Sequence, residues 1–397
     1  MEGRVKRIVY LSFYFEPDLC AGSFRNSPLA IELASQVEGE AIVEVYTTLP
    51  NRYNSFSPEA PEYEERGNLK IHRIALPKHK SGMMDQIRSF SRYYFSVLKL
   101  NRRKKADLIF ASSSRLFTAY LGSVLSRKFN VPLYLDIRDL FVDTISDVLK
   151  SKLTGLFLLP TLKWIERRTF ETANHINVIS GGFKPYFTGY PNPTYSDFSN
   201  GIDDEFLEAG QTISLTESEE NDVKTILYAG NIGEGQGLHR IIPETAKAVG
   251  KAFKFVVIGD GGMKQRLRKR LEEVGADNVV LRDPIPRNEL IKAYKSEDYL
   301  FLHLNDYPAF RKVLPSKIFE MAALNKPILA GVSGFSAEFL KNEVPVTHLF
   351  KPCNPTELVE ILRNTDSKKP INREQFISSH KRSTINQKMA ESIKNYL

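Results

Sequence analysis

The 397-residue sequence lacks the features that mark several large classes of protein. Its only two cysteines, Cys20 and Cys353, lie in different halves of the chain, which excludes a disulfide framework and is typical of a reducing compartment. The seven histidines are scattered without metal-ligand spacing, so we expect no metal site. A Gly-x-Ser-x-Gly motif, a Walker P-loop and an Asp-x-Asp pair are also absent, which removes the signatures of several hydrolases and of a common divalent-metal clamp.

Long hydrophobic runs are missing as well. The opening MEGRVKR and the apolar run after it have the outline of a secretory signal, but the run is short and leads into Glu16 and Asp18 instead of a small-residue cleavage site. We therefore expect a first β-strand there. The other apolar stretch, residues 153–162, is too short to span a bilayer and contains Pro160. The prediction is a cytoplasmic protein that contacts a membrane only peripherally, on the inner face of the cytoplasmic membrane.

Positive charge is what the sequence has in excess. The net charge is +8, and residues 70–128 contain 14 Lys or Arg against only two acidic residues, Asp85 and Asp107. Such a patch indicates an anionic partner. No nucleic-acid-binding motif accompanies it, so we expect an anionic membrane surface as the partner and no nucleic acid.

Residues 83–105 are the part of this patch that best fits a membrane-facing helix. Apolar residues recur there at helical spacing and precede the basic run 102–105, as in an interfacial helix. The apolar stripe comprises Met84, Ile87, Phe90, Tyr94 and Leu98. The alternative is that the stripe packs against a sheet, and we expect only part of it to be free for lipid.

Short apolar runs alternate with helical stretches along the chain, which predicts an α/β protein with two doubly wound parallel sheets. The strands expected in the first half are 8–15, 41–48, 69–76, 106–112, 132–138 and 175–180. Those expected in the second half are 225–230, 253–259, 278–282, 299–304 and 327–332. Because the chain is longer than one hydrophobic core usually fills, we expect one domain for each sheet.

The segment 188–222 is rich in Pro, Gly, Ser, Asn and acidic residues, which predicts a linker. We therefore place the first domain at residues 1–190 and the second at residues 223–378. Residues 374–397 have the pattern of a closing helix, which need not belong to the domain that precedes it.

Two glycine-rich loops follow predicted strands of the second half. One begins Gly230-Asn231 and ends at Gly237, and the other is Gly259-Asp260-Gly261-Gly262. In parallel α/β sheets, ligands bind beyond the carboxyl ends of the strands, where glycine lets the backbone approach a pyrophosphate. Each loop alone is equally consistent with ordinary turn geometry, but two such loops in one domain favour a nucleotide.

A third feature is Pro315-Ser316-Lys317-Ile318-Phe319-Glu320, in which proline and serine begin a helix after a predicted strand. Lys317 and Glu320 are three residues apart and so share one face of the first helical turn. Lys317 can then meet a phosphate and Glu320 a sugar hydroxyl. The alternative from spacing alone is an ion pair between the two side chains. The position of the helix after a strand favours the ligand-binding interpretation.

Motifs along nearly the whole chain resemble glycosyltransferase family 4, in particular its branch of N-acetyl-L-fucosamine transferase-like proteins of bacterial surface polysaccharide assembly. The motifs that carry the resemblance are Phe15-Glu16-Pro17, Gly22-Ser23-Phe24-Arg25, Asp136-Ile137-Arg138-Asp139-Leu140, Ser180-Gly181-Gly182-Phe183-Lys184, Asn200-Gly201-Ile202-Asp203, Tyr228-Ala229-Gly230-Asn231-Ile232-Gly233, Gly259-Asp260-Gly261 and Leu314-Pro315-Ser316-Lys317-Ile318-Phe319-Glu320. The resemblance implies a GT-B fold of two Rossmann-like domains that face a cleft. It also implies an acceptor site in the first domain, a nucleotide-sugar site in the second, and a helix at about 380–397 that crosses back to the first.

The loops, the resemblance and the departures from it together predict donor contacts for individual residues. They are Gly22, Ser23, Gly230, Asn231, Gly259, Asp260, Ile285, Arg311, Leu314, Pro315, Ser316, Lys317 and Glu320. Of these, Gly22 and Ser23 would border the donor phosphates. The nucleoside pocket would be lined by Asp260 and Ile285. The implied catalytic residues are Arg138, Asp139 and Lys317.

Glu320 would hold the ribose and Lys317 the diphosphate. Arg138 falls where many relatives carry an active-site histidine. It would lie with Asp139 beside the transferred sugar. One departure from the family is Lys312, eight residues before Glu320, where relatives have glutamate.

The second departure is at Asn231 and Gln236, where relatives frequently carry arginine and lysine. The diphosphate charge must then be met elsewhere, which gives more weight to Lys317 and Arg311.

The predicted function is therefore a retaining, metal-independent glycosyltransferase without a cofactor, with a UDP-sugar as donor substrate and a glycan or lipid-linked oligosaccharide as acceptor. Two alternatives remain. One is a catalytically inactive nucleotide-sugar-binding partner subunit, indicated by Lys312, and the other is a sugar-nucleotide epimerase of the same fold, which the transferase motifs disfavour. The sequence does not distinguish which sugar moves, or uracil from guanine in the base.

Overall fold

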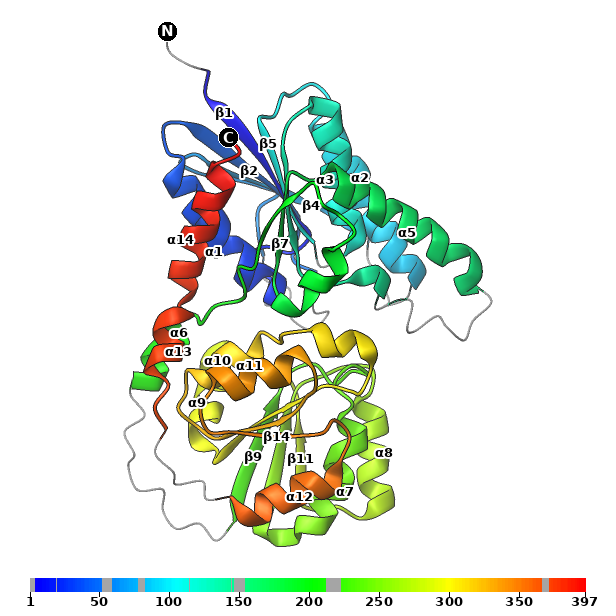
Figure 1. Cartoon of the computed structure of the whole chain (residues 1–397), viewed down its shortest axis with the longest axis vertical. Coiled ribbons are helices and arrows are strands. Elements are labelled where there is room, and N and C mark those ends of the chain that lie inside the picture. The colour runs from blue at the N-terminus through cyan, green and yellow to red at the C-terminus, as the bar shows by residue number, and fades with distance from the viewer. Residues whose placement is uncertain are drawn as a thin grey trace. The chain divides into compact units, whose positions relative to one another are not determined.

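The structure is a computed structural model that describes residues 4–18, 20–51, 59–77, 83–113, 115–143, 145, 154–211, 223–365 and 371–397. The chain divides into two compact units (Figure 1). The first comprises Met1–Asn200 together with Ser383–Leu397, and the second comprises Gly201–Arg382. Each is built on one sheet.

The sheet of the first unit has the strand order β3-β4-β2-β1-β5-β6-β7-β8. Its strands are β1 (Lys6–Ser12), β2 (Ala41–Thr48), β3 (Tyr63–Arg66), β4 (Leu69–Ile74), β5 (Leu108–Ser113), β6 (Leu133–Ile137), β7 (His175–Val178) and β8 (Thr194–Ser196). All neighbouring pairs are parallel except β3 and β4. The prediction of a parallel sheet therefore needs one correction at this edge. The two-residue turn between β3 and β4 begins with Gly67, whose φ of 61° suits a tight antiparallel hairpin.

Helices cover both faces of this sheet (Figure 1). On one face lie α1 (Ala21–Gln36) and α14 (Arg382–Lys394), and on the other lie α2 (Met83–Leu100), α3 (Leu116–Phe129) and α5 (Thr154–Thr172). Met389 and Ile393 of α14 share a core with Leu29 of α1 and Ile8 of β1. The last helix is thus part of the first core although it follows the second unit in sequence.

The sheet of the second unit is entirely parallel, in the order β11-β10-β9-β12-β13-β14. Its strands are β9 (Lys224–Ala229), β10 (Phe253–Ile258), β11 (Val279–Arg282), β12 (Tyr299–His303), β13 (Ile328–Gly331) and β14 (Thr347–Phe350). Strand β14 was not predicted. It is a short, half-buried edge strand without a clear apolar alternation, so periodicity does not reveal it.

The helices of the second unit also form two layers. One core joins the sheet to α7 (Leu238–Val249), α8 (Lys264–Val274) and α12 (Pro355–Asn364). The other joins it to α6 (Asp204–Gln211), α9 (Arg287–Ser296), α10 (Lys317–Ala322), α11 (Phe335–Glu343) and α13 (Glu374–Ser379). The described chain also has the 3₁₀ helices η1 (Gly181–Phe187), η2 (Gly250–Ala252) and η3 (Pro308–Lys312).

The boundary between the units differs from the predicted limits of 190 and 223. The first unit extends to Asn200 because β8 pairs with β7 at the sheet edge. The second begins at Gly201 because Phe206 of α6 is buried in its core. Residues 212–222 of the predicted linker lie outside the described residues. The predicted closing helix 374–397 is two helices, α13 and α14, which meet around His380.

Candidate functional site

The two predicted glycine-rich loops of the second unit touch each other at the carboxyl ends of β9 and β10. Gly230 has a φ of 142° and Gly259 a φ of 151°. A Cβ atom on Gly259 would lie 1.8 Å from the carbonyl oxygen of Gly230, so no side chain fits there. The amide of Ile232 donates to the carbonyl oxygen of Asp260 at 2.8 Å, which fastens the loops together. Close backbone approach, and not turn geometry alone, requires these glycines.

Lys317 lies directly over Gly230. A Cβ atom on Gly230 would be only 1.6 Å from Lys317 Nζ. The same Nζ is 4.6 Å from the centroid of the Tyr228 ring, and the Tyr228 hydroxyl donates to the carbonyl oxygen of Asn231 at 2.6 Å. Helix α10 and strand β9 therefore bring an ammonium group to the start of the β9–α7 loop.

Burial lowers the pKa of Lys317 to about 8, and the neighbouring Glu320 acts in the opposite direction. Within the described residues, Lys317 forms no ion pair with Glu320 or with any other carboxylate. The i,i+3 ion pair that spacing alone allows is thus not formed. Lys317 is a desolvated cation whose charge an anionic ligand would stabilise.

Glu320 lies among charged groups of the second unit. Burial raises the pKa of its carboxyl group, and Arg287 and Lys317 oppose that effect. Arg287, the first residue of α9, pairs with Asp203 and lies 2.7 Å from Glu205. Asp203 also pairs with Arg382. Arg287 was not among the predicted site residues, because only the fold brings α9 beside α10.

The other predicted donor residues of the second unit occupy loops and helix starts that follow its strands. The Oδ1 atom of the exposed Asp260 accepts the amide of Gly261 at 2.8 Å. Ile285 follows β11 and packs against the core. Arg311 follows β12, and its exposed guanidinium forms an ion pair with Asp306 at 3.2 Å.

Leu314 is buried, and the carbonyl oxygen of Pro315 accepts the amide of Ile318 at 3.1 Å as α10 begins. Ser316 precedes the helix, but its side chain makes no capping hydrogen bond. The predicted ribose and diphosphate residues therefore sit on a short helix whose start is fixed mainly by backbone contacts.

In the first unit, the structure brings Arg138 beside Gly22. A Cβ atom on Gly22 would be 3.2 Å from Arg138 Nη1. The buried Nε of Arg138 has no hydrogen-bond partner among the described residues, and burial lowers the pKa of this guanidinium while Asp136 opposes the effect. Ser23 is buried one residue further along α1, and Asp139 is exposed.

A buried ion pair supports this end of the first sheet. Arg25 donates to both carboxylate oxygens of Asp136 at 2.8 Å. Ser112 and Asn177 donate to the same carboxylate at 2.9 and 2.8 Å. Arg25 belongs to the motifs quoted above, but nothing in its spacing reveals that Asp136 is its partner.

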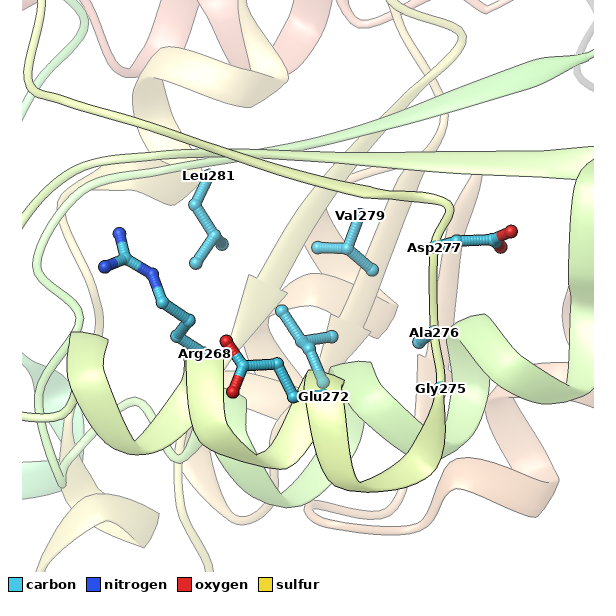
Figure 2. A pocket seen from close by; sticks show the side chains of 8 residues that line it. Arg268, Glu272, Gly275, Ala276, Asp277, Val279 and Leu281 are labelled. Carbon is cyan, nitrogen blue, oxygen red and sulfur yellow. The ribbon is translucent and has the colours of Figure 1, made fainter.

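Within the described residues, two other kinds of site are absent. No group of three or more His, Cys, Asp or Glu residues could hold a metal ion, and no helix is long and apolar enough to cross a membrane. A shallow groove runs between α8 and the edge strand β11 (Figure 2). It is lined by Arg268, Leu271, Glu272, Gly275, Ala276, Asp277, Val279 and Leu281, none of which is a predicted site residue.

Helix α2 buries part of the predicted apolar stripe, together with side chains outside it. Its fully buried side chains include Tyr93 and Val97, which are not in that stripe. Of the stripe, Phe90 is buried and Ile87 is 54% exposed, while Tyr94 and Leu98 are half-buried. The side chain of Met84 lies outside the described residues.

The exposed face of α2 combines basic residues with one large aromatic side chain. Arg88, Arg92, Phe95 and Lys99 are all exposed and recur at intervals of three or four residues, which places them on one helix face. Phe95 is 67% exposed. The basic run 102–105 follows the end of this helix and is exposed as well.

Comparison with known proteins was made on sequence and on fold. Residues 212–382 match the family described as "Glycosyl transferases group 1". The protein named "Putative colanic acid biosynthesis glycosyl transferase WcaI" of Escherichia coli (strain K12) is 26% identical over 276 residues, which are 66% of this chain and 67% of that protein. These two findings confirm the predicted enzyme class.

Solved structures share the fold at low sequence identity. Sucrose-phosphate synthase from Thermosynechococcus elongatus has a TM-score of 0.74 at 14% identity and covers 98% of both chains. Alr3699/HepE of Anabaena, in complex with UDP-glucose, has a TM-score of 0.66 at 16% identity and covers 98% of this chain and 99% of its own. The predicted GT-B architecture of two α/β domains is thereby confirmed.

Proposed function

We propose that this glycosyltransferase moves a sugar from a UDP-sugar to a glycan or lipid-linked acceptor, with retention of anomeric configuration and without a metal ion, in bacterial surface polysaccharide assembly. Support for the donor comes from the site in the second unit and from HepE, whose structure contains UDP-glucose. Support for the pathway comes from WcaI, whose name refers to colanic acid biosynthesis. The resemblance to N-acetyl-L-fucosamine transferases makes that branch part of the proposal.

The observation that carries the proposal is the position of Lys317 over Gly230, whose backbone packs against Gly259. The two glycines let the backbone of both loops and the Lys317 ammonium group come together at the carboxyl ends of the strands, where α/β sheets bind nucleotides. The pyrophosphate gains negative charge as the glycosyl bond breaks. A fixed ammonium group in a desolvated place stabilises that charge more strongly than it stabilises the intact donor.

Glu320 is proposed to hold the ribose. A carboxylate accepts hydrogen bonds from two neighbouring hydroxyl groups, and the nearby Arg287 and Lys317 favour the ionised form of Glu320 against burial. Arg311 is a second cation for the diphosphate. Its ion pair with Asp306 is exposed on both sides, and exposed ion pairs are weak, so the guanidinium is free to change partners.

In the first unit, Arg138 and Asp139 are proposed to act beside the transferred sugar. Arg138 is suited to an anionic or hydroxyl-rich ligand because its buried Nε lacks a partner among the described residues. The buried pair of Arg25 and Asp136 keeps this end of β6 rigid.

The acceptor is proposed to be lipid-linked and reached at an anionic membrane surface through α2. The exposed row of Arg88, Arg92 and Lys99 around Phe95 supports this, since basic residues draw a helix to anionic headgroups while an aromatic side chain inserts. Trp164 of α5 is a second large exposed aromatic side chain of the first unit.

A thermal-shift panel of UDP, GDP and ADP tests the donor site. UDP should raise the melting temperature of the wild type, because a ligand that binds only the folded state stabilises it. Lys317→Ala should lose most of the shift. Lys254→Ala is the matched control, because this exposed lysine lies on β10 near the opposite end of the same sheet, and it should keep the shift. If no nucleotide raises the melting temperature of the wild type, the proposed donor site is wrong.

The inactive partner subunit remains the second candidate, because Lys312 stands where the family has glutamate. Measurement of UDP release from a UDP-sugar separates the candidates. An inactive subunit binds the UDP-sugar without releasing UDP. An epimerase converts the sugar while the sugar stays attached to UDP.

A further inference from the structure

His303 at the end of β12 joins the β9–α7 loop to the segment after β14. It is 0% exposed, and its ring lies 6.1 Å from both the Phe301 and the Phe350 rings in stacked geometry. Its Nδ1 is 2.6 Å from the carbonyl oxygen of Gln236, and its Nε2 accepts the backbone amide of Cys353 at 2.9 Å. Because a carbonyl can only accept, Nδ1 carries the hydrogen and the ring is neutral.

Two other observations show that this position is built for the ring. A Cβ atom on Gly331 of β13 would lie 2.4 Å from His303 Cδ2, so only glycine leaves space for the imidazole. Burial lowers the pKa of His303 to about 4. The neutral form with one donor and one acceptor therefore persists at physiological pH.

Asn305 holds the preceding part of the loop in the same way. Its backbone amide donates to the carbonyl oxygen of Gly235 at 2.8 Å, and its Nδ2 donates to that of Glu234 at 2.8 Å. His303 at the end of β12 and Asn305 just after it therefore hold the carbonyl oxygens of three consecutive loop residues, Glu234, Gly235 and Gln236. At the other end of the loop, the Tyr228 hydroxyl holds the carbonyl oxygen of Asn231.

The side chain of Gln236 transmits this constraint across the loop. Its Oε1 accepts from Asn231 Nδ2 at 2.8 Å and from the amide of Gly233 at 3.3 Å. Gln236 and Asn231 thus close the loop over Gly233. Asn231 directly follows Gly230, the glycine beside which Lys317 Nζ lies. A shift of the Gln236 backbone would open this closure.

We propose that His303 is a positioning residue for donor binding, which fixes Gln236 and so holds the β9–α7 loop in the conformation that binds the diphosphate. This inference rests on the proposed function, which places the donor at that loop. His303 touches neither the donor nor the reacting atoms. It acts by keeping the loop in its binding conformation before the ligand arrives, which avoids the cost of ordering it on binding.

The test compares two substitutions of His303 in the full chain. In His303→Gln, an amide replaces the imidazole and again supplies one donor and one acceptor. In His303→Phe, an aromatic ring remains but both hydrogen bonds are lost. Tyr299→Phe is the control, because it removes a hydrogen bond of 3.1 Å to the carbonyl oxygen of Thr365 from the first residue of the same strand. UDP binding is measured by calorimetry and loop opening by hydrogen exchange of residues 231–237.

We expect His303→Phe to raise the Kd for UDP about tenfold or more, since a carbonyl and an amide of the half-buried residues Gln236 and Cys353 lose their partner. Exchange of residues 231–237 should accelerate in the same variant. His303→Gln should restore both, and Tyr299→Phe should change neither. Gln236→Ala, a change at a half-buried side chain, should weaken UDP binding without destabilising the fold. Its effect should not add fully to that of His303→Phe, because both act on one closure.

Unchanged UDP binding in both His303→Phe and Gln236→Ala would overturn the inference, as would an equal loss in Tyr299→Phe. If the wild type binds no UDP, the proposed function is wrong. In that case hydrogen exchange alone decides whether His303 positions the loop, and equal exchange rates in wild type and His303→Phe would refute it.

Discussion

The affinity for UDP should fall with rising pH because Lys317 is half-buried and partly desolvated. In the free protein its pKa is lowered to about 8, whereas a bound diphosphate would return that pKa toward the usual lysine value of about 10.4. The ammonium form, which attracts the diphosphate, is present below pH 8 and is lost as the pH rises through that value. Between pH 7 and pH 9 the charged fraction falls from about 0.9 to about 0.1. The Kd for UDP should therefore rise about tenfold, or about 1.4 kcal/mol.

Calorimetric titration of UDP at pH 7, 8 and 9 measures this dependence. Lys317→Arg is the control, because a guanidinium stays charged throughout the range and the variant then reports the titration of UDP and of all other groups. Wild-type affinity should fall more steeply than that of the variant. If the two proteins show the same pH dependence, Lys317 does not carry the titrating charge and the argument from its burial fails.

Three further predictions concern the site and the membrane surface. Glu320→Ala should mainly raise KM for the donor. Lys317→Ala should mainly lower kcat, by about 10²- to 10³-fold, because only Lys317 stabilises charge that develops in the transition state. If both variants show the steady-state kinetics of the wild type, the proposed site is wrong. Activity should survive a chelator, and strict dependence on an added divalent ion would refute metal independence. Co-sedimentation with vesicles should increase with anionic lipid and decrease with salt, and it should weaken when residues 102–105 are all changed to Gln; binding insensitive to all three would exclude the electrostatic surface.

Much of the fold could be predicted because the central strands are continuous apolar runs. The runs at 225–230 and 253–259 became β9 and β10, the middle of a buried parallel sheet. Of the four edge strands, β11 was predicted, but β3, β8 and β14 were not. Strand β3 is the sequence YEER, which is half-buried or exposed and has no apolar period, so its place depends on the turn at Gly67.

The face of α2 illustrates a second limit of periodicity. Tyr93 and Val97 have the same helical spacing as Tyr94 and Leu98, so the pattern offers two neighbouring apolar stripes. Only packing against the sheet selects one of them, and the hydroxyl of the buried Tyr93 donates to the carbonyl oxygen of Tyr46 at 2.8 Å.

The site could be predicted as motifs but not as an arrangement. Spacing placed Lys317 and Glu320 on one helical turn, yet it could not show that the ammonium group lies over Gly230. Nor could it show that His303, one of seven scattered histidines, holds the carbonyl oxygen of Gln236. These contacts join a helix or a strand end to a loop that follows another strand, and the sheet order that brings these elements together is a property of the whole fold.

The central claim is that the chain transfers a sugar from a UDP-sugar to an acceptor. The release of free UDP tests this claim most directly. The purified protein is incubated in a chelator with UDP-sugars, with and without a lipid-linked glycan extract, and free UDP is measured. The account predicts UDP release that depends on the acceptor and is lost in Lys317→Ala. No UDP release from any UDP-sugar with acceptor present, or release that Lys317→Ala leaves unchanged, would contradict it.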